Sequence, residues 1–152
     1  ETVGDSEARS VAYCTNPAHG TRVIPPGAIT GAQFIQTEKY IQVTGTLDQT
    51  ALNIAADDPG GEMDPMGADM KGNPLGGLMY TTAFSRDNRP EQSRYWTNFM
   101  GNNQFCIKVC IPEGDDARRE CEHIYDRIGC AYNVYADYAN LEDKFESCEG
   151  DV

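Results

Sequence analysis

The sequence predicts an α+β domain that is mainly β: an antiparallel sheet, or a small barrel or sandwich, with a long Gly/Asp/Pro loop and a disulfide-tied C-terminal helix. Three observations support this class. Short segments alternate apolar and polar residues, as half-buried strands do. Six cysteines occur in 152 residues, five of them between Cys106 and Cys148, which is typical of a disulfide framework. One helical pattern lies near the C-terminus. The length suits a single domain spanning residues 1–152.

The first strands are predicted between Ile24 and Leu52, where β-branched and aromatic residues are separated by turn residues. Phe34–Thr37 and Tyr40–Thr46 read as two paired strands of an antiparallel sheet, because the side chains of the second segment alternate in polarity. Ala51–Ile54 is a candidate third strand.

The segment from Asp57 to Gly77 has no such alternation. Six glycines and three prolines interrupt it, and they are incompatible with a helix or a central strand. We therefore expect one long ordered loop. Strand character resumes in Leu78–Phe84 and again in Gln104–Ile111.

A helix is predicted to begin at Asp115 or Asp116, whose side chains accept hydrogen bonds from a first helical turn, and to end at Gly129. Spacings of four, three and four residues place one set of side chains on a face directed at the sheet. This set is Ala117, Cys121, Ile124 and Ile128. The tail from Asn140 to Val152 is expected to hold a short helical turn.

The cysteines allow 15 pairings, and spacing favours some over others. Cys106 and Cys110 lie on one side of a predicted strand, and we expect them to bridge to the helix region that holds Cys121 and Cys130. Either Cys14 or Cys148 is expected to close a terminus. All six are therefore predicted disulfide residues.

Charge excludes several classes of protein. The 12 Lys and Arg against 24 Asp and Glu leave a net charge of −12, which disfavours binding to nucleic acid and to anionic membranes. No apolar stretch approaches the ~20 residues that cross a bilayer. Together with the cysteines, this predicts a secreted, extracellular protein. Because Glu1–Ser10 is polar and acidic, that prediction requires a leader already removed.

The acidic loop is a candidate calcium site, since Ca²⁺ takes six to eight oxygen ligands in flexible geometry. The predicted oxygen donors are Asp57, Asp58, Glu62, Asp64, Asp69 and Asn73. The spacing is not that of an EF-hand, because Met66 and Ala68 would occupy ligand positions. The alternative is an acidic loop that is solvated or packed by its own turns.

A second candidate site is aromatic: Tyr95, Trp96 and Phe99 either stack on sugars or belong to a core or interface. No catalytic motif is present, and no catalytic residue is predicted. A glycan hydrolase would need two carboxylates with separated pKa values, and the pair Glu62 and Asp64 is no better than chance among 24 acidic residues.

Long irregular motifs resemble small secreted fungal proteins of the IgE-binding, allergen-like family. They are Tyr13-Cys14-Thr15, His19-Gly20-Thr21-Arg22, Ile24-Pro25-Pro26-Gly27-Ala28-Ile29-Thr30-Gly31, Gly60-Gly61-Glu62-Met63-Asp64-Pro65, Gly67-Ala68-Asp69, Gly72-Asn73-Pro74, Trp96-Thr97-Asn98-Phe99 and His123-Ile124-Tyr125-Asp126. The resemblance spans nearly the whole chain and implies a fungal extracellular protein without established catalysis. Met66 departs from the histidine of many such proteins, which weakens a metal site there.

The chain also resembles the small non-catalytic subunits of heterodimeric fungal laccases, which are acidic secreted chains of similar size. That resemblance implies a partner protein, with copper belonging to the larger subunit.

These observations favour a secreted, non-catalytic binding or accessory protein whose partner is another secreted protein, such as a laccase large subunit, or a cell-wall glycan. The alternatives are a calcium- or carbohydrate-binding extracellular module, with Ca²⁺ as its only candidate cofactor, and then a small glycan hydrolase.

Overall fold

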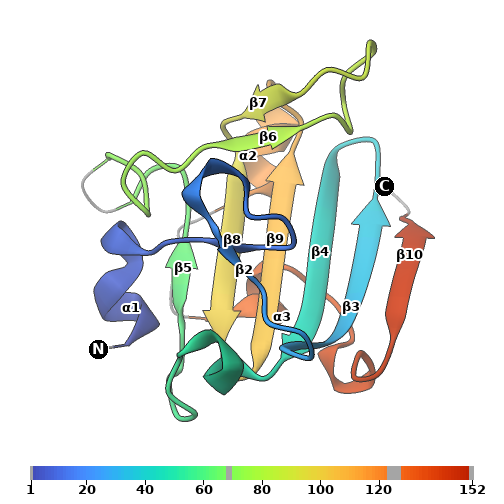
Figure 1. The fold of residues 1–152 in the computed structure, drawn as a ribbon. Coiled ribbons are helices and arrows are strands. Elements are labelled where there is room, and N and C mark those ends of the chain that lie inside the picture. Colours follow the sequence, from blue (N-terminus) through green and yellow to red (C-terminus); the bar gives the residue numbers. More distant parts are fainter. Residues whose placement is uncertain (1, 68–69, 123–127, 151–152) are drawn as a thin grey trace.

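The computed structural model describes residues 2–67, 70–122 and 128–150. Its centre is a six-stranded sheet in the order β10-β3-β4-β9-β8-β5, and two further pairs, β1-β2 and β6-β7, lie outside it (Figure 1). The strands are β1 (Tyr13–Cys14), β2 (Arg22–Val23), β3 (Ile29–Gln36), β4 (Tyr40–Leu47), β5 (Gly61–Met63), β6 (Met79–Thr81), β7 (Glu91–Ser93), β8 (Trp96–Gly101), β9 (Gln104–Cys110) and β10 (Phe145–Glu149).

Helices are short. The α-helices are α1 (Val3–Ser6), α2 (Asp115–Glu120) and α3 (Cys130–Asn133), and 3-10 turns occupy Glu7–Arg9, Ala18–Gly20, Gln49–Leu52 and Tyr138–Asn140. The α+β, mainly β class is confirmed.

The central sheet is open, with β10 and β5 at its two edges (Figure 1). Every neighbouring pair is antiparallel except β10 with β3, which is parallel. The antiparallel sheet is thus the correct alternative among those predicted, and the barrel is wrong.

The predicted strand pair forms β3 and β4. Thr37 is buried in the turn between them and organises it, because its hydroxyl oxygen accepts hydrogen bonds from the backbone N–H groups of Lys39 (3.1 Å) and Tyr40 (3.0 Å). The predicted strand Gln104–Ile111 is confirmed as β9, and Leu78–Phe84 contains the shorter β6.

Two predictions before residue 70 are wrong. Ala51–Ile54 is not a strand: Asp48 accepts a hydrogen bond from the Thr50 N–H (3.0 Å) and caps the 3-10 turn Gln49–Leu52. The Asp57–Gly77 segment is not entirely loop, because Gly61–Met63 forms β5. Gly61 suits this position since a Cβ there would lie 2.3 Å from a Glu7 carboxylate oxygen, so a side chain would displace the N-terminal segment.

The predicted C-terminal helix begins at Asp115 as expected, but its predicted extent to Gly129 is wrong. Helix α2 ends at Glu120, and Cys121 has non-helical backbone angles (φ −114°, ψ 53°). Gly129 (φ 84°) does not end this helix but precedes α3. Ile128 is 54% exposed and not part of a buried face, and Ile124 lies outside the described residues.

The tail differs from its prediction as well. The predicted helical turn after Asn140 is absent from the described part of the tail, where β10 pairs with β3 instead. The sequence Phe-Glu-Ser-Cys-Glu has no β-branched residue and all five of its residues are exposed, so neither propensity nor burial marked it as a strand.

Two disulfides hold the helices against β9: Cys106–Cys130 and Cys110–Cys121. The expectation that Cys106 and Cys110 bridge to the helix region is confirmed. Cys14 and Cys148 are free thiols, so the predicted terminal bridge is not formed.

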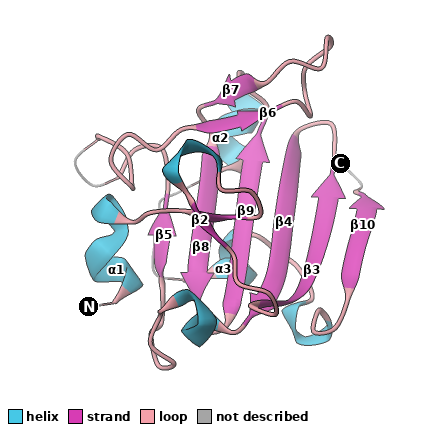
Figure 2. Cartoon of the chain, in the orientation of Figure 1, coloured by secondary structure: helices cyan, strands magenta, loops and turns pink. Residues whose placement is uncertain are grey.

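The sheet has two unlike faces, and both disulfides leave from the same one. We call the face of Cys106 and Cys110 the stapled face and the opposite face, which carries Ile107 and Val109, the apolar face. Figure 2 shows α3 behind the strands and the N-terminal segment with β2 in front of them. The stapled face is therefore the one turned away from the viewer.

Candidate functional site

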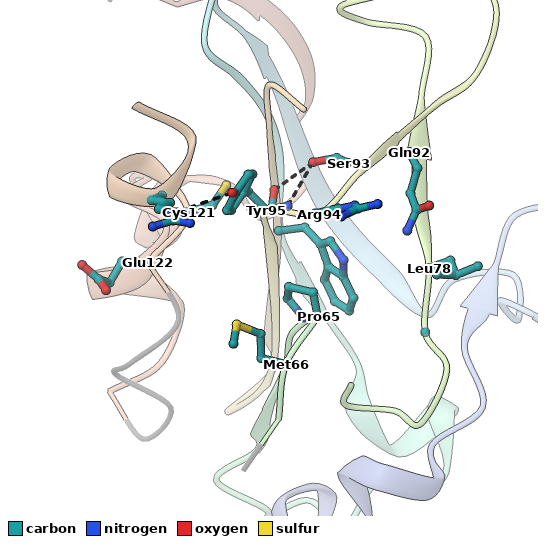
Figure 3. A pocket seen from close by; sticks show the side chains of 12 residues that line it. Pro65, Met66, Leu78, Gln92, Ser93, Arg94, Tyr95, Cys121 and Glu122 are labelled. Atoms are coloured by element: carbon teal, nitrogen blue, oxygen red, sulfur yellow. Dashed lines mark hydrogen bonds between the residues drawn. The ribbon is translucent and has the colours of Figure 1, made fainter. Parts of the chain in front are cut away.

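A cleft of about 700 Å³ lies beside the start of β8, and we call it the edge cleft. Its lining includes Pro65, Met66, Leu78, Arg94, Tyr95 and Arg118 (Figure 3). Three separate parts of the chain thus meet here: the end of β5, the β6–β7 pair, and α2.

The cleft exists because β5 stops pairing with β8 early. The β5–β8 register runs from Gly61 opposite Met100 to Met63 opposite Asn98. Asp64 then exchanges backbone hydrogen bonds with Asn73 (both 3.0 Å), which turns the chain away. In that register Pro65 would face Trp96, and a proline has no N–H to continue the ladder.

The bend between β7 and β8 is held by Ser93. Its buried hydroxyl donates to the Cys110 carbonyl oxygen (2.8 Å), and its oxygen accepts from the Tyr95 N–H (3.3 Å; Figure 3). The hydroxyl of Ser93 is thereby committed to structure.

Tyr95 positions one of the two cationic groups of the cleft. The Arg118 Nε donates a hydrogen bond to the Tyr95 hydroxyl oxygen at 3.5 Å (Figure 3). This hydrogen bond raises the pKa of the Arg118 guanidinium, which is ionised at any physiological pH. Arg118 is exposed and Tyr95 is half-buried, so both remain accessible from the cleft.

Arg94 is the second cationic group. It is exposed and forms no hydrogen bond or ion pair with any residue that the structure describes. Of the residues that the structure describes, two arginines and one carboxylate, that of Glu122, line the cleft. The ratio is the reverse of the whole chain, which has 24 acidic and 12 basic residues. With apolar Pro65 and Leu78 nearby, the cleft offers positive charge, an aromatic ring and apolar surface, which are binding groups.

The structure separates the three aromatic residues predicted to bind sugars. Tyr95 lines the cleft. Trp96 is 5% exposed and packs with Met63 and Val109, and Phe99 is 6% exposed in the cluster around the Cys106–Cys130 disulfide. Successive strand residues point to opposite faces, which is why Tyr95 and Trp96 diverge. Trp96 and Phe99 are core residues, although Trp96 also borders the cleft.

Two of the predicted calcium ligands act as hydrogen-bond acceptors within their own turns. Asp64 accepts from the N–H groups of Met66 and Gly67 (both 2.7 Å). Asp58 accepts from the Gly60 N–H (2.9 Å) and from the Val3 N–H (2.8 Å), which joins the loop to α1.

The other donors are dispersed. Glu62 is 1% exposed and accepts a hydrogen bond from the Thr97 hydroxyl, while the Asn73 amide donates to the Glu7 carboxylate (2.8 Å). Asp57 is exposed, and Asp69 lies outside the described residues. Among the residues described, no group of three His, Cys, Asp or Glu side chains is arranged to hold a metal ion. The calcium site stays a prediction.

Sequence reasoning missed Arg94 and Arg118 as cleft residues. The run Arg94-Tyr95-Trp96 was a usable signal, because a basic residue beside two aromatics is uncommon in so acidic a chain. The sequence offered no such signal at Arg118, because the helical pattern places this residue on the solvent-facing side of the predicted helix.

The fold and this cleft define a small disulfide-linked, mainly β domain with a cleft at one sheet edge. The chain is similar to two fungal proteins of Mycosarcoma maydis. It is 51% identical to appressorium protein ROW1 over 152 residues, which are 99% of this chain and 35% of that protein. It is 45% identical to appressorium protein ROW2 over 150 residues, which are 99% of this chain and 50% of that protein.

The chain therefore spans about a third and a half of the lengths of these relatives. No family model matches it, and no solved structure matches it. None of the helices in the described ranges combines the length and the apolar character needed to cross a bilayer.

Proposed function

We propose that this chain is an extracellular, non-catalytic binding or accessory domain that docks another secreted protein on the apolar face of its sheet. The observation that carries the proposal is the inverted burial of the two faces. Polar side chains are buried under the stapled face, while the apolar side chains that the opposite face carries on β3 and β4 stay partly in contact with water, although those at Val109 and Trp96 are buried.

Strand register defines the apolar face. Phe34 of β3, Val43 of β4 and Ile107 of β9 are successive cross-strand partners, and such partners point to the same side of a sheet. All three are half-buried. On β10 the face continues to Phe145, which is 69% exposed.

The stapled face has the opposite pattern. On β4, Gln42 is 4% and Thr44 0% exposed, and on β9 Lys108 is 9% exposed. The Gln42 amide donates to the Tyr135 carbonyl oxygen (3.1 Å), which ties this face to the C-terminal segment. When a partner covers the apolar side chains that are still in contact with water, the complex is stabilised. The free energy gained is about 25 cal/mol per Å² of apolar surface removed from water.

Three observations support an extracellular setting. The two disulfides suit an oxidising compartment. The net charge of −12 keeps an incompletely covered surface soluble. The relatives are named appressorium proteins of a fungus. The resemblance to non-catalytic laccase subunits supplies a first partner to test, the laccase large subunit.

Native mass spectrometry of the protein isolated from its source tests the proposal. We expect a second protein at fixed stoichiometry, and loss of that complex in the variant Phe34→Ser/Val43→Ser with its circular dichroism spectrum unchanged. Tyr135→Ser is the matched control, because this side chain is 82% exposed on another part of the surface. A lone chain, or a complex that both variants retain, would contradict docking on the apolar face.

A further inference from the structure

We propose that the edge cleft binds a short acidic oligosaccharide, with its carboxylates at Arg94 and Arg118 and a sugar ring against Tyr95. This inference does not depend on docking at Phe34 and Val43, because neither residue lines the cleft.

Size is the first argument. The cleft encloses about 700 Å³, within the range of roughly 300 to 1,000 Å³ that small-molecule sites occupy.

Charge is the second argument. Arg94 has no partner among the described residues, and Arg118 is oriented by Tyr95. A guanidinium binds a carboxylate through two parallel N–H···O bonds, and such charge-assisted bonds are stronger than neutral ones. Glu122 is the one carboxylate among the described residues of the lining, so the cleft favours an anion even though the chain as a whole is acidic. At physiological salt the Debye length is about 8 Å, so the repulsion between a bound anion and carboxylates farther away than this is largely screened.

The placement of the arginines indicates an oligomer. Figure 3 shows Arg94 on one side of the strand, toward Gln92 and Leu78, and Tyr95 on the other side, toward Cys121. Arg118 is on the Tyr95 side, because it donates a hydrogen bond to the Tyr95 hydroxyl. A ligand that reaches both guanidinium groups extends past the strand edge and carries more than one negative charge.

The remaining lining favours a sugar over a peptide. An extended peptide would add to the sheet through a row of free backbone groups, but Pro65, which borders the gap beside Trp96, has no N–H to offer. Polar side chains also line the cleft, among them the Gln92 amide and the Glu122 carboxylate, which offer hydrogen bonds to hydroxyl groups. The half-buried Tyr95 ring offers an apolar surface with a polar end.

Isothermal titration calorimetry of the intact chain with trigalacturonate tests the proposal, with maltotriose as the neutral sugar and triglutamate as the acidic peptide. We expect trigalacturonate to bind most tightly. Arg94→Gln and Arg118→Gln should each weaken its binding about tenfold, as expected when a charge-assisted contact is lost. Arg86→Gln, which removes the same charge from an exposed position in the loop before β7, should leave the affinity within about twofold.

Three results would overturn the inference: no heat with trigalacturonate, equal binding of maltotriose, or equal weakening by Arg86→Gln. Tighter binding of triglutamate would also overturn it and identify a peptide site. None of these outcomes bears on partner binding by the Phe34→Ser/Val43→Ser variant, so the two proposals fail separately.

Discussion

The two faces of the sheet differ in how they are covered, and the difference separates stability from recognition. On the stapled face, two disulfides and the segments that follow β9 enclose Phe99, Val134 and Leu141. The apolar face is crossed by the N-terminal segment with β2 (Figure 1), but Phe34 and Val43 remain half-buried. The stapled face is thus closed by this cluster. The apolar face is buried around Trp96 and Val109 but stays partly open to water at Phe34 and Val43.

Deleting one aromatic side chain from each face gives the largest expected contrast. Phe99→Ala should lower the free energy of unfolding by about 3 to 5 kcal/mol, because Phe99 is enclosed by the disulfide cluster. Phe34→Ala should cost only about 1 kcal/mol, since part of its ring is already in water. Urea unfolding measures both. Equal losses would show that the two faces are equally closed.

The disulfides should rank next. Cys106→Ala/Cys130→Ala removes a bridge across 24 residues and Cys110→Ala/Cys121→Ala one across 11, and each should cost about 3 kcal/mol, the longer somewhat more. Thermal or urea unfolding tests this. Cys14→Ala/Cys148→Ala is the control, because both are free thiols and their loss should leave stability nearly unchanged. A comparable loss in that control would indicate a third bridge.

The buried cation of the stapled face provides a smaller contrast. Burial lowers the pKa of Lys108, whose ammonium lies 3.5 Å from the Glu120 carboxylate and 3.9 Å from the Tyr40 ring centre. Glu120→Gln leaves that charge without its carboxylate and should cost about 1 to 2 kcal/mol.

Lys108→Met removes the desolvated charge and should be close to neutral in urea unfolding. If Lys108→Met proved the more damaging of the two, the ion pair would be a net stabilising contact in its own right.

Alkaline pH should produce the smallest effect. Burial raises the pKa of Tyr138 well above its usual range, and its hydroxyl donates to the Val134 carbonyl oxygen (2.8 Å). The unfolded chain ionises this group near pH 10, so the stability that the neutral phenol provides is present below pH 10 and is lost as the pH rises further.

Tyr138→Phe should therefore be about 1 kcal/mol less stable than the parent chain at pH 8, through the lost hydrogen bond. That gap should narrow by about 1 kcal/mol between pH 10 and 11. Urea titrations at several pH values measure it, and a constant gap would mean that Tyr138 also ionises in the folded state.

Particular segments show where prediction from sequence succeeded. The alternation of side chains along Tyr40–Thr46 and Gln104–Ile111 predicted β4 and β9. The spacing of Cys106 and Cys110, which puts both on one side of a strand, predicted that both bridge to the helix region. These are local patterns, and local sterics and strand geometry decide them.

Other segments depend on distant partners. Three-residue β5 exists because β8 lies beside it, and β10 exists because β3 offers an edge, so neither has a pattern of its own. The edge cleft combines Pro65, Arg94 and Arg118 from separate elements, and its geometry follows from where β5 stops pairing. Of the three aromatic residues predicted as a binding site, Trp96 and Phe99 are buried. The sequence did not show this, because the burial of each side chain depends on what covers its face of the sheet.

The sequence by itself determined the mainly β class, the main strand pair, the acidic charge and the segment in which disulfides form, because these depend on residue type and short spacing. Only the tertiary structure decided which face of the sheet is closed. Alternation gives every strand two faces, but the covering of a face depends on segments far along the chain. Here the chain after β9, held by Cys121 and Cys130, closes over the side with Gln42 and Thr44 and leaves Phe34 and Val43 partly in water.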